Sequence, residues 1–345
     1  MTFLRRIAGL MLVLGLVTAL AACSGIKPGN AKAFQPLKEA TVAKLTSMGS
    51  APGKGMLIRI FKESSELEVW KETASGYKLF KTYAICAWSG ELGPKIKEGD
   101  RQSPEGFYTI TPGLMNPNSN YYLAFNTGFP NKFDRAYGRT GSDLMVHGDC
   151  SSRGCYSMTD ESIAEIYALA RETFKGGNSS FQLQIFPFRM TPQNLAKHST
   201  SAHMAFWQNI KEGYDRFEVT KSPPSWDVCN RQYIFDVPSG IGVLDAVAAC
   251  PAEIGQRTMT AAVAAKQAAD AVAIQAEVAN LEKKAAAEKA AADKEAAAYA
   301  EAKARGEAIG SFVGGLFGGG KNADVQGTID PTKKAPVPQR RPQRG

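Results

Sequence analysis

A histidine and a cysteine eight residues apart carry the chemistry that this sequence could perform. A short apolar run, Leu144 to Val146, leads into His147-Gly148, and a polar loop follows that ends in Gly154-Cys155. A thiol is a poor nucleophile until it loses its proton, and a nearby imidazole can take that proton and form a thiolate–imidazolium pair. We therefore predict that Cys155 is a nucleophile and that His147 is its general base.

Three other interpretations of these residues stay open at this point. Cys150 and Cys155 could form a local disulfide, or both could be buried in a plain core. A zinc ion could instead be bound by His147 and the two cysteines, with His198 or His203 as the fourth ligand. Zinc sites usually have two to four residues between paired cysteines, so this spacing is at the limit. We expect a nucleophile and neither a metal nor a cofactor.

The elements on both sides of the pair must position it. An apolar strand would deliver His147, and a helix is predicted to begin after the cap candidates Thr159 and Asp160. The start of that helix would add positive potential near Cys155. Backbone amides of Gly154 and Cys155 are the predicted donors to an oxyanion.

The rest of the chain up to residue 240 reads mostly as strands. Apolar runs and alternating apolar and polar residues are separated by clusters of Gly, Ser, Pro and Asn, which is typical of a β meander. The predicted strands cover 56–61, 66–71, 77–86, 107–110, 121–126, 144–146, 181–186 and 231–237, and the predicted helices cover 161–174 and 204–210. We expect a mainly β domain with one or two helices and a single sizeable core.

The first 22 residues resemble a secretory signal. Arg5 and Arg6 precede an apolar run, Ile7 to Leu20, which is shorter than the ~20 residues that a membrane span needs. The run ends in a sequence like a bacterial lipobox, which predicts cleavage before Cys23 and a lipid on its thiol; ordinary cleavage near Ala22 is the alternative. We expect a periplasmic protein that a lipid anchors to the outer membrane, with residues 23–54 as an N-terminal tether.

Four further cysteines could form disulfides in such an oxidising compartment. With Cys23 lipidated and Cys155 a nucleophile, an even number remains and three pairings are possible. We favour Cys229 with Cys250, because it would tie the start of the C-terminal segment to the globular domain. Cys86 would then pair with Cys150, although all four could also be reduced.

The C-terminal third of the chain differs in composition. Residues 241–309 are dominated by Ala with Glu, Lys and Gln, which predicts a long helix and a possible coiled coil. Residues 310–345 are Gly-rich, then basic and Pro-rich, and we expect a disordered tail. The net charge is +8, and half of it lies in the last 25 residues. A basic tail suits anionic lipid or wall polymer, and we expect no nucleic-acid partner.

A long series of short motifs resembles one known family. The region from about Met56 to Trp226 is similar to the L,D-transpeptidase catalytic domain of the YkuD type, and within it to the YafK-like branch. The motifs that carry the resemblance are Gly93-Pro94-Lys95, Gly99-Asp100, Ser103 to Tyr108, Met115-Asn116-Pro117, Phe129-Pro130-Asn131, Asp134-Arg135-Ala136, Met145 to Gly148, Ser152 to Cys155, Phe186 to Thr191, Phe206-Trp207 and Gly213-Tyr214-Asp215.

The resemblance implies a β-sandwich catalytic domain, which we place at residues 55–240. It implies that Cys155 is the nucleophile and His147 the base, with the amides of Gly154 and Cys155 as oxyanion donors. Weaker candidates for substrate binding are Gly148, Ser152, Arg153, Arg135 and Arg139. The sequence departs from the wider family in two ways, because its loop is about half as long and Arg153 stands where a second histidine is usual.

The family acts on peptidoglycan stem peptides. The resemblance therefore implies an acyl-enzyme on Cys155, formed at meso-diaminopimelate and passed to an amine, which would cross-link the wall or attach an outer-membrane protein. Hydrolysis that releases wall-linked lipoprotein is the first alternative, since the YafK-like branch is associated with it. A non-catalytic lipoprotein tether between outer membrane and cell wall is the second.

Overall fold

The computed structural model describes residues 28–237, 240–255 and 260–317. The predicted signal segment, Cys23 and the basic tail lie outside these residues. Two compact units divide the described chain at Leu281/Glu282. The first holds every strand, and the second holds the later part of a long helix.

A five-stranded mixed sheet forms the middle of the first unit. Its strand order is β3 (Gly76–Ala84), β2 (Glu66–Thr73), β1 (Met56–Phe61), β9 (Phe181–Phe186) and β4 (Gly106–Ile110). β1 is antiparallel to β2 and parallel to β9. All six residues of β1 are buried, as expected for a central strand that is covered on both faces.

A smaller four-stranded sheet carries the predicted histidine and cysteine. Its order is β5 (Met115–Asn116), β6 (Ala124–Asn126), β7 (Met145–His147) and β8 (Tyr156–Ser157). β7 pairs in parallel with β8 and antiparallel with β6.

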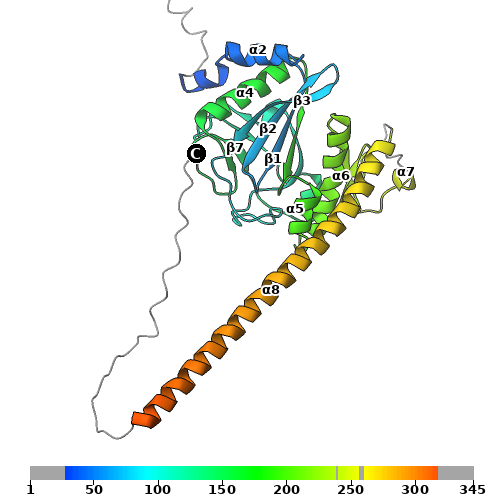
Figure 1. Cartoon of the computed structure of the whole chain (residues 1–345). Coiled ribbons are helices and arrows are strands. Elements are labelled where there is room, and N and C mark those ends of the chain that lie inside the picture. Colours follow the sequence, from blue (N-terminus) through cyan, green and yellow to red (C-terminus); the bar gives the residue numbers. More distant parts are fainter. Residues whose placement is uncertain (1–27, 238–239, 256–259, 318–345) are drawn as a thin grey trace, which may run out of the picture. The chain divides into compact units, whose positions relative to one another are not determined.

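Helices lie on both sides of the five-stranded sheet, with α4 and α6 on opposite sides in Figure 1. Thr159 caps α4 by accepting a hydrogen bond from the Ser162 amide at 3.1 Å, which confirms that predicted cap. The helical elements are η1 (Pro28–Phe34), α2 (Glu39–Ser47), η2 (Pro112–Leu114), α3 (Lys132–Ala136), α4 (Asp160–Lys175), α5 (Pro192–Lys197), α6 (Met204–Thr220), α7 (Ala252–Gly255) and α8 (Ala261–Phe317).

Two apolar cores result from the alternation of side chains along the central strands. Ile58 and Ile60 of β1 face a core shared with the smaller sheet and α4. Phe61 belongs to a second core, formed with Trp207 of α6 and with Tyr233 of the hairpin of β10 (Trp226–Cys229) and β11 (Gln232–Phe235). Because period-2 alternation sends neighbouring residues to opposite faces, one strand supports both layers.

These layers confirm the predicted mainly β fold of the L,D-transpeptidase type, with two long helices beside its sheets. The predicted strands 56–61 and 181–186 have the bounds that the structure gives to β1 and β9. Strands β5 and β8 have only two residues each, and the sequence did not indicate them. Helix α6 runs to Thr220, ten residues beyond its predicted end at 210.

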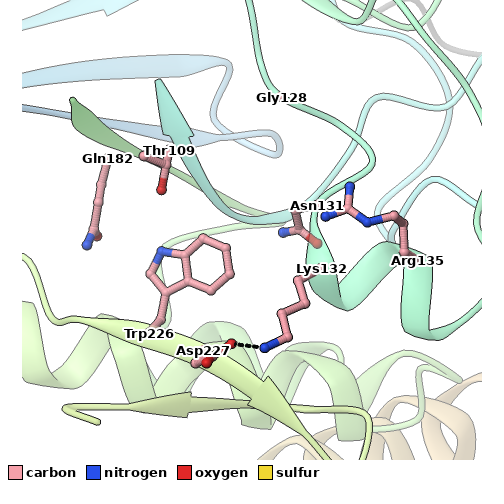
Figure 2. A pocket seen from close by; sticks show the side chains of 8 residues that line it. All are labelled: Thr109, Gly128, Asn131, Lys132, Arg135, Gln182, Trp226 and Asp227. Atoms are coloured by element: carbon pink, nitrogen blue, oxygen red, sulfur yellow. Dashed lines mark hydrogen bonds and ion pairs between the residues drawn. The ribbon is translucent and has the colours of Figure 1, made fainter. Parts of the chain in front are cut away.

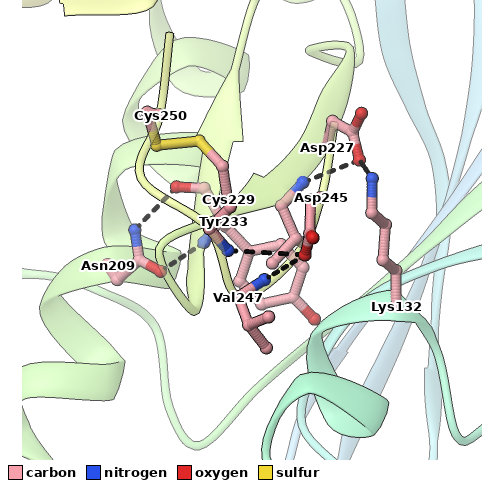
Figure 3. Close-up of a disulfide and its surroundings, with 10 residues drawn as sticks. Lys132, Asn209, Asp227, Cys229, Tyr233, Asp245, Val247 and Cys250 are labelled. Atoms are coloured by element: carbon pink, nitrogen blue, oxygen red, sulfur yellow. Dashed lines mark hydrogen bonds and ion pairs between the residues drawn. A yellow bond between two sulfur atoms is a disulfide. The ribbon is translucent and has the colours of Figure 1, made fainter. Parts of the chain in front are cut away.

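The hairpin of β10 (Trp226–Cys229) and β11 (Gln232–Phe235) is held to its surroundings by a disulfide and by hydrogen bonds (Figure 3). Cys229 is bonded to Cys250, with their Cα atoms 5.2 Å apart. The Asn209 side chain on α6 both accepts from the Tyr233 amide, at 2.8 Å, and donates to its carbonyl, at 2.9 Å. The pairing of Cys229 with Cys250 is the one that the sequence favoured.

Helix α8 begins at Ala261, later than the predicted start at residue 241, and ends at Phe317, beyond the predicted end at residue 309. It continues through Gly306 and Gly310 to Phe317, whereas a flexible Gly-rich segment was expected from residue 310. The long Ala-rich run explains the difference, since propagation of a formed helix tolerates isolated glycines that each cost about 1 kcal/mol. Within the first unit, Asp270 of α8 is paired with Lys211 of α6 at 2.6 Å. A helix long and apolar enough to cross a membrane is not found in the described part of the chain.

Candidate active site

The register of β7 and β8 brings the predicted pair to one face of the smaller sheet. Val146 pairs with Tyr156, so Cys155 lies opposite Met145, one position before β8 begins. Met145 and His147 are two residues apart on β7 and therefore point to the same face as Cys155. The side chains of His147 and Cys155 thus share a face and lie on a diagonal between neighbouring strands.

His147 is buried and its ring is oriented by its own backbone. Its Nδ1 lies 2.5 Å from the Gly148 carbonyl oxygen, which can only accept, so Nδ1 carries the hydrogen. Nε2 is then left as the proton acceptor. The Tyr121 ring lies against the imidazole, with centroids 4.8 Å apart. Burial lowers the pKa of His147, and the Gly148 carbonyl and Asp149 oppose that change.

Cys155 is half-buried and its thiol is hydrogen-bonded to backbone. The Met145 amide donates to Sγ at 3.4 Å, and the thiol points to the Asp143 carbonyl at 3.7 Å. Burial raises the pKa of Cys155, partly offset by the Met145 amide and by Lys95. Both shifts favour a neutral thiol and a neutral imidazole over the thiolate–imidazolium pair that the sequence suggested.

Three serines hold the backbone at the cysteine. Ser152 and Ser103 donate to the Cys155 carbonyl at 2.7 and 3.2 Å. Ser89 accepts the Gly154 amide hydrogen at 2.9 Å. Ser152, a predicted substrate-binding residue, supports the backbone of the predicted nucleophile in this structure, and Ser89 and Ser103 were not predicted as site residues.

The Gly154 amide is thus already engaged, although the sequence assigned it to an oxyanion hole. Gly154 has φ +120°, and a side chain there would also press on Leu144, whose Cδ2 lies 3.3 Å from the position of a Cβ. Glycine is therefore required by the backbone of the loop. Of the two predicted oxyanion donors, the Cys155 amide therefore remains the candidate.

The start of helix α4 does not face the thiol as predicted. Strand β8 separates Cys155 from the helix, and Asp160 at its first position accepts the Asp149 amide at 3.0 Å. A Cβ on Gly148 would lie 2.5 Å from that Asp160 oxygen, so the close approach of this carboxylate requires glycine. The helix end holds the loop in place and leaves the pKa of Cys155 raised.

A disulfide ties the loop between His147 and Cys155 to Cys86. Cys150 is bonded to Cys86, with 5.1 Å between Cα atoms, and among the described cysteines Cys155 is the free thiol. Neither the local disulfide with Cys155 nor the zinc site with a Cys150 thiolate is compatible with this bond. His198 and His203 pack instead beside the indole of α6.

The predicted substrate-binding arginines have different surroundings. Arg139 is buried in an ion pair with Asp134 at 2.8 Å and lies over the Phe133 ring, so it stabilises the fold and is not available to a substrate carboxylate. Arg135 and Arg153 are exposed. The sequence could not separate these cases, because each is a basic residue in a loop-like segment.

A buried lysine organises the segment that supplies Ser103, one of these serines. Lys62 Nζ donates to three backbone carbonyls between Glu91 and Ser103, at 2.8 to 3.1 Å, and lies 2.9 Å from Glu105 Oε1. The other oxygen of Glu105 accepts from the Trp207 indole at 2.9 Å. This network fixes the segment that ends in Ser103 and so reaches the Cys155 carbonyl.

Comparisons with known proteins agree with the motifs. A family model described as the L,D-transpeptidase catalytic domain matches residues 57–176. YafK of Escherichia coli, in strains K12 and O157:H7, is 45% identical over 186 residues, which cover 54% of this chain and 76% of YafK. YafK is itself named as an L,D-transpeptidase without an established activity.

Two solved structures are more distant. The helical cell shape determining protein Pgp2 of Campylobacter jejuni is 21% identical with a TM-score of 0.31, over 42% of this chain and 54% of Pgp2. Bd1075 of Bdellovibrio bacteriovorus is 20% identical with a TM-score of 0.28, over 49% of this chain and 61% of Bd1075. Scores this low support no statement about the fold or activity of this chain.

Proposed function

The chain belongs to the L,D-transpeptidase family, and from this premise we propose that it modifies peptidoglycan stem peptides through an acyl-enzyme on Cys155. The observation that carries the proposal is the placement of His147 and Cys155 on one face of the β7–β8 pair. The Nδ1 hydrogen bond to Gly148 leaves Nε2 ready to take the thiol proton.

In the first half of the reaction, Sγ attacks the carbonyl carbon on the L side of the scissile bond at meso-diaminopimelate. His147 Nε2 accepts the thiol proton as the new C–S bond forms. The tetrahedral intermediate collapses when the C–N bond breaks, and the imidazolium returns the proton to the leaving amine. A thioester on Cys155 and a free amine are the products.

The negative oxygen of the intermediate needs a donor that is held in place. The Cys155 amide is suited to this role because Ser152 and Ser103 fix the carbonyl of the same residue. Loss of a single oxyanion donor typically costs about 100-fold to 1000-fold in rate.

In the second half, an acceptor amine attacks the thioester carbonyl and gives its proton to His147. The C–S bond breaks, the thiol takes up the proton, and a new amide remains. With an amine from a neighbouring stem peptide the product is a cross-link, and with an amine from a protein it is an attached protein.

Water is the competing acceptor, and hydrolysis would release wall-linked lipoprotein. The observation that favours hydrolysis is the short loop between His147 and Cys155, in which Arg153 stands where the wider family has a second histidine. Arg153 is exposed in this loop and adds a positive charge to it. Hydrolysis needs no residue beyond those already placed, since His147 can activate the water.

The cellular setting of the enzyme is part of the same proposal. A lipid on Cys23 would anchor it to the outer membrane from the periplasmic side, where peptidoglycan lies. The two disulfides of the structure suit an oxidising compartment. Wall-linked lipoprotein or an outer-membrane protein would be its protein partners, and a non-catalytic tether is the alternative in this setting.

The test is a product analysis with sacculi that carry linked protein. Purified residues 24–345 and a Cys155→Ala variant are each incubated with the sacculi, and muropeptides and released protein are identified by mass. New cross-links that depend on Cys155 would support transfer, and release without new cross-links would support hydrolysis. An unchanged substrate with both proteins would contradict catalysis and favour the tether.

A further inference from the structure

The Tyr121 ring forms a surface layer over the proposed general base. Its centroid lies 4.8 Å from that of the His147 imidazole, with 39° between the two planes. His147 is 3% exposed, whereas Tyr121 is 48% exposed. A ring that contacts a buried group and is itself half in solvent separates that group from water. Tyr121 therefore keeps solvent from one side of the imidazole.

Backbone contacts hold Tyr121 in this place. Its amide donates to the Ser119 hydroxyl at 3.0 Å, and its carbonyl accepts the Gly148 amide hydrogen at 3.0 Å. A Cβ on Gly148 would lie 3.1 Å from that carbonyl oxygen and 3.0 Å from the Tyr122 Cβ, so the segment lies directly against the residue after His147. Tyr121 thus meets the end of β7 twice, through its ring at His147 and through its carbonyl at Gly148.

The residue after Tyr121 has a backbone conformation that its surroundings must hold. Tyr122 has φ +65°, in the left-handed region, which costs a residue with a Cβ about 1–3 kcal/mol. The Lys32 ammonium lies over the Tyr122 ring, 4.9 Å from its centroid, and adds a cation–π attraction. Lys32 belongs to η1, where the Ala33 carbonyl accepts from Arg171 of α4 at 2.5 Å. The N-terminal segment, docked on α4, therefore supports the turn that carries Tyr121.

The partly exposed indole of Trp226 has different surroundings. It lines a polar cavity of about 470 Å³ together with Thr109 and Gln182 (Figure 2). Its ring packs against Tyr233, which belongs to the second core, whereas the smaller sheet shares the first core. In the described part of the chain, the aromatic cover of His147 is thus supplied by Tyr121 and has no connection with this cavity.

We propose that Tyr121 is a positioning residue for His147 and that its ring fixes the plane of the imidazole and excludes water from it. The inference rests on the proposed function, because it concerns the base that takes the Cys155 proton. The Nδ1 contact with the Gly148 carbonyl restrains one edge of the imidazole, and the ring contact restrains its plane. Nε2 then keeps one direction while the proton is transferred.

Removal of the ring should also change the proton affinity of the imidazole. Burial is the largest cause of the lowered pKa of His147, and Tyr121 supplies part of that burial. The charged or titratable groups packed around this region are Asp149 in the same loop, Asp160 of α4, Lys32 of η1 and Cys155 before β8. Because Tyr121→Ala leaves these groups in place, the pKa of His147 should rise toward its ordinary value.

NMR titration of the histidine ring protons in residues 24–345 tests the cover directly. The chain has three histidines, and the signal of His147 is the one missing from His147→Gln. We expect the pKa of His147 to rise by about half a pH unit in Tyr121→Ala and to change by less than about 0.2 in Tyr121→Phe, which keeps the ring. Tyr137→Ala is the matched control, because Tyr137 is 52% exposed and its ring packs on Phe133 at 4.9 Å.

Initial rates on sacculi test the positioning. We expect Tyr121→Ala to lower kcat about 10-fold with little change in KM, and to move the acid limb of kcat/KM to higher pH together with the pKa measured by NMR. Tyr121→Phe and Tyr137→Ala should react like the parent. A rise in KM alone would show that Tyr121 binds substrate and would overturn the proposal.

The two proposals can fail separately. If the parent is active and Tyr121→Ala matches it in kcat and in the pKa of His147, the positioning role is wrong while the proposed function stands. A pKa that falls in Tyr121→Ala would also overturn the proposal, because the ring would then stabilise the imidazolium instead of covering a neutral base. If the parent is inactive on sacculi, the proposed function fails, and the titration still decides whether Tyr121 covers His147.

Discussion

The first unit contains two acid–base pairs whose surroundings differ sharply. Lys62 and Glu105 are both fully buried, and each polar atom of the pair has a partner. His147 and Cys155 are also removed from solvent to a large extent, but the imidazole and thiol are each bonded to nearby backbone. The Lys62–Glu105 pair is saturated with hydrogen bonds, whereas the thiol proton of Cys155 is held by one long contact to the Asp143 carbonyl and His147 uses Nδ1 for its backbone contact.

The difference assigns separate tasks to the two pairs. Lys62 Nζ has four oxygen acceptors, which suits an ammonium group, although burial lowers its pKa and Glu105 opposes that fall. Removal of either partner would leave a buried group without compensation, so the network behaves as one rigid unit. The pKa shifts of His147 and Cys155 favour a neutral pair, which would acquire charge when a substrate reacts.

Loss of the reactive pair should have the largest effect on activity. Cys155→Ala should abolish acyl transfer, and His147→Gln should lower kcat by about 1000-fold, because general-base catalysis contributes about 100-fold to 10,000-fold. Initial rates on sacculi measure the change. Both variants should keep the parent's circular dichroism and melting midpoint, and a His147→Gln rate within 10-fold of the parent would remove His147 from the mechanism.

Loss of the saturated pair should appear in stability. Lys62→Met should lower the free energy of unfolding by about 3–5 kcal/mol, since Glu105 is left buried without its partner. Urea denaturation measures this change. Lys97→Met is a matched control on an exposed lysine and should stay within about 0.5 kcal/mol of the parent. A loss below 1 kcal/mol for Lys62→Met would contradict the contrast between the pairs.

The serine that joins the two regions should affect both quantities moderately. Ser103→Ala removes the donor to the Cys155 carbonyl and the acceptor of the Ser89 amide. We expect kcat to fall about 10-fold with little change in KM, and the free energy of unfolding to fall by about 1–2 kcal/mol. Ser47→Ala on the exposed face of α2 serves as control. A change confined to KM would mean that Ser103 acts on substrate binding and not on the nucleophile.

The pH dependence follows from the direction of the two pKa shifts. A lowered pKa keeps His147 a neutral base from below pH 6.5, and a raised pKa keeps Cys155 protonated to above pH 9. We expect a plateau in kcat/KM between these limits, with a fall on the acid side as His147 is protonated. Rates measured in buffers of constant ionic strength define the limbs. A sharp optimum one unit wide would contradict this assignment.

The smallest expected effect is on alkylation of the resting thiol. Since burial raises the pKa of Cys155, iodoacetamide should react slowly at pH 7 and faster as the pH rises. His147→Gln should change this rate less than about 2-fold, because the resting thiol is bonded to backbone and not to the imidazole. Rapid alkylation at pH 7 that is lost in His147→Gln would show a resting thiolate–imidazolium pair and would contradict a neutral His147–Cys155 pair.

The sequence predicted what local patterns can encode. Strand periodicity located β1 and β9, and a strand followed by a loop and a capped helix located His147 and Cys155. Ser89 and Ser103 escaped prediction because they reach Cys155 and its neighbour only through contacts 65 and 52 residues apart in sequence. Such pairs depend on tertiary packing, which a single sequence does not display.

Length and burial account for the other differences. Two-residue strands are too short to show a period, so β5 and β8 could not be recognised. Helix α6 continues past its predicted end through Gly213, where the Phe235 ring packs so closely that a Cβ would lie 2.4 Å from it. Arg139 looked like a surface cation, and only the fold reveals its buried partner Asp134.

The bond between Cys86 and Cys150 also sets an order of events in the maturation of the enzyme. This bond ties the loop that leads to Cys155 to Cys86, so three of the six cysteines, Cys86, Cys150 and Cys155, are candidates for pairing here while the chain is reduced, and Cys155 is the one left free. Oxidation must then select Cys86 over the nearer Cys155 as the partner of Cys150, and a wrong choice would consume the nucleophile. Since Cys86 follows β3 of the five-stranded sheet, the correct pairing is favoured when that sheet has formed before oxidation and holds Cys86 beside the loop.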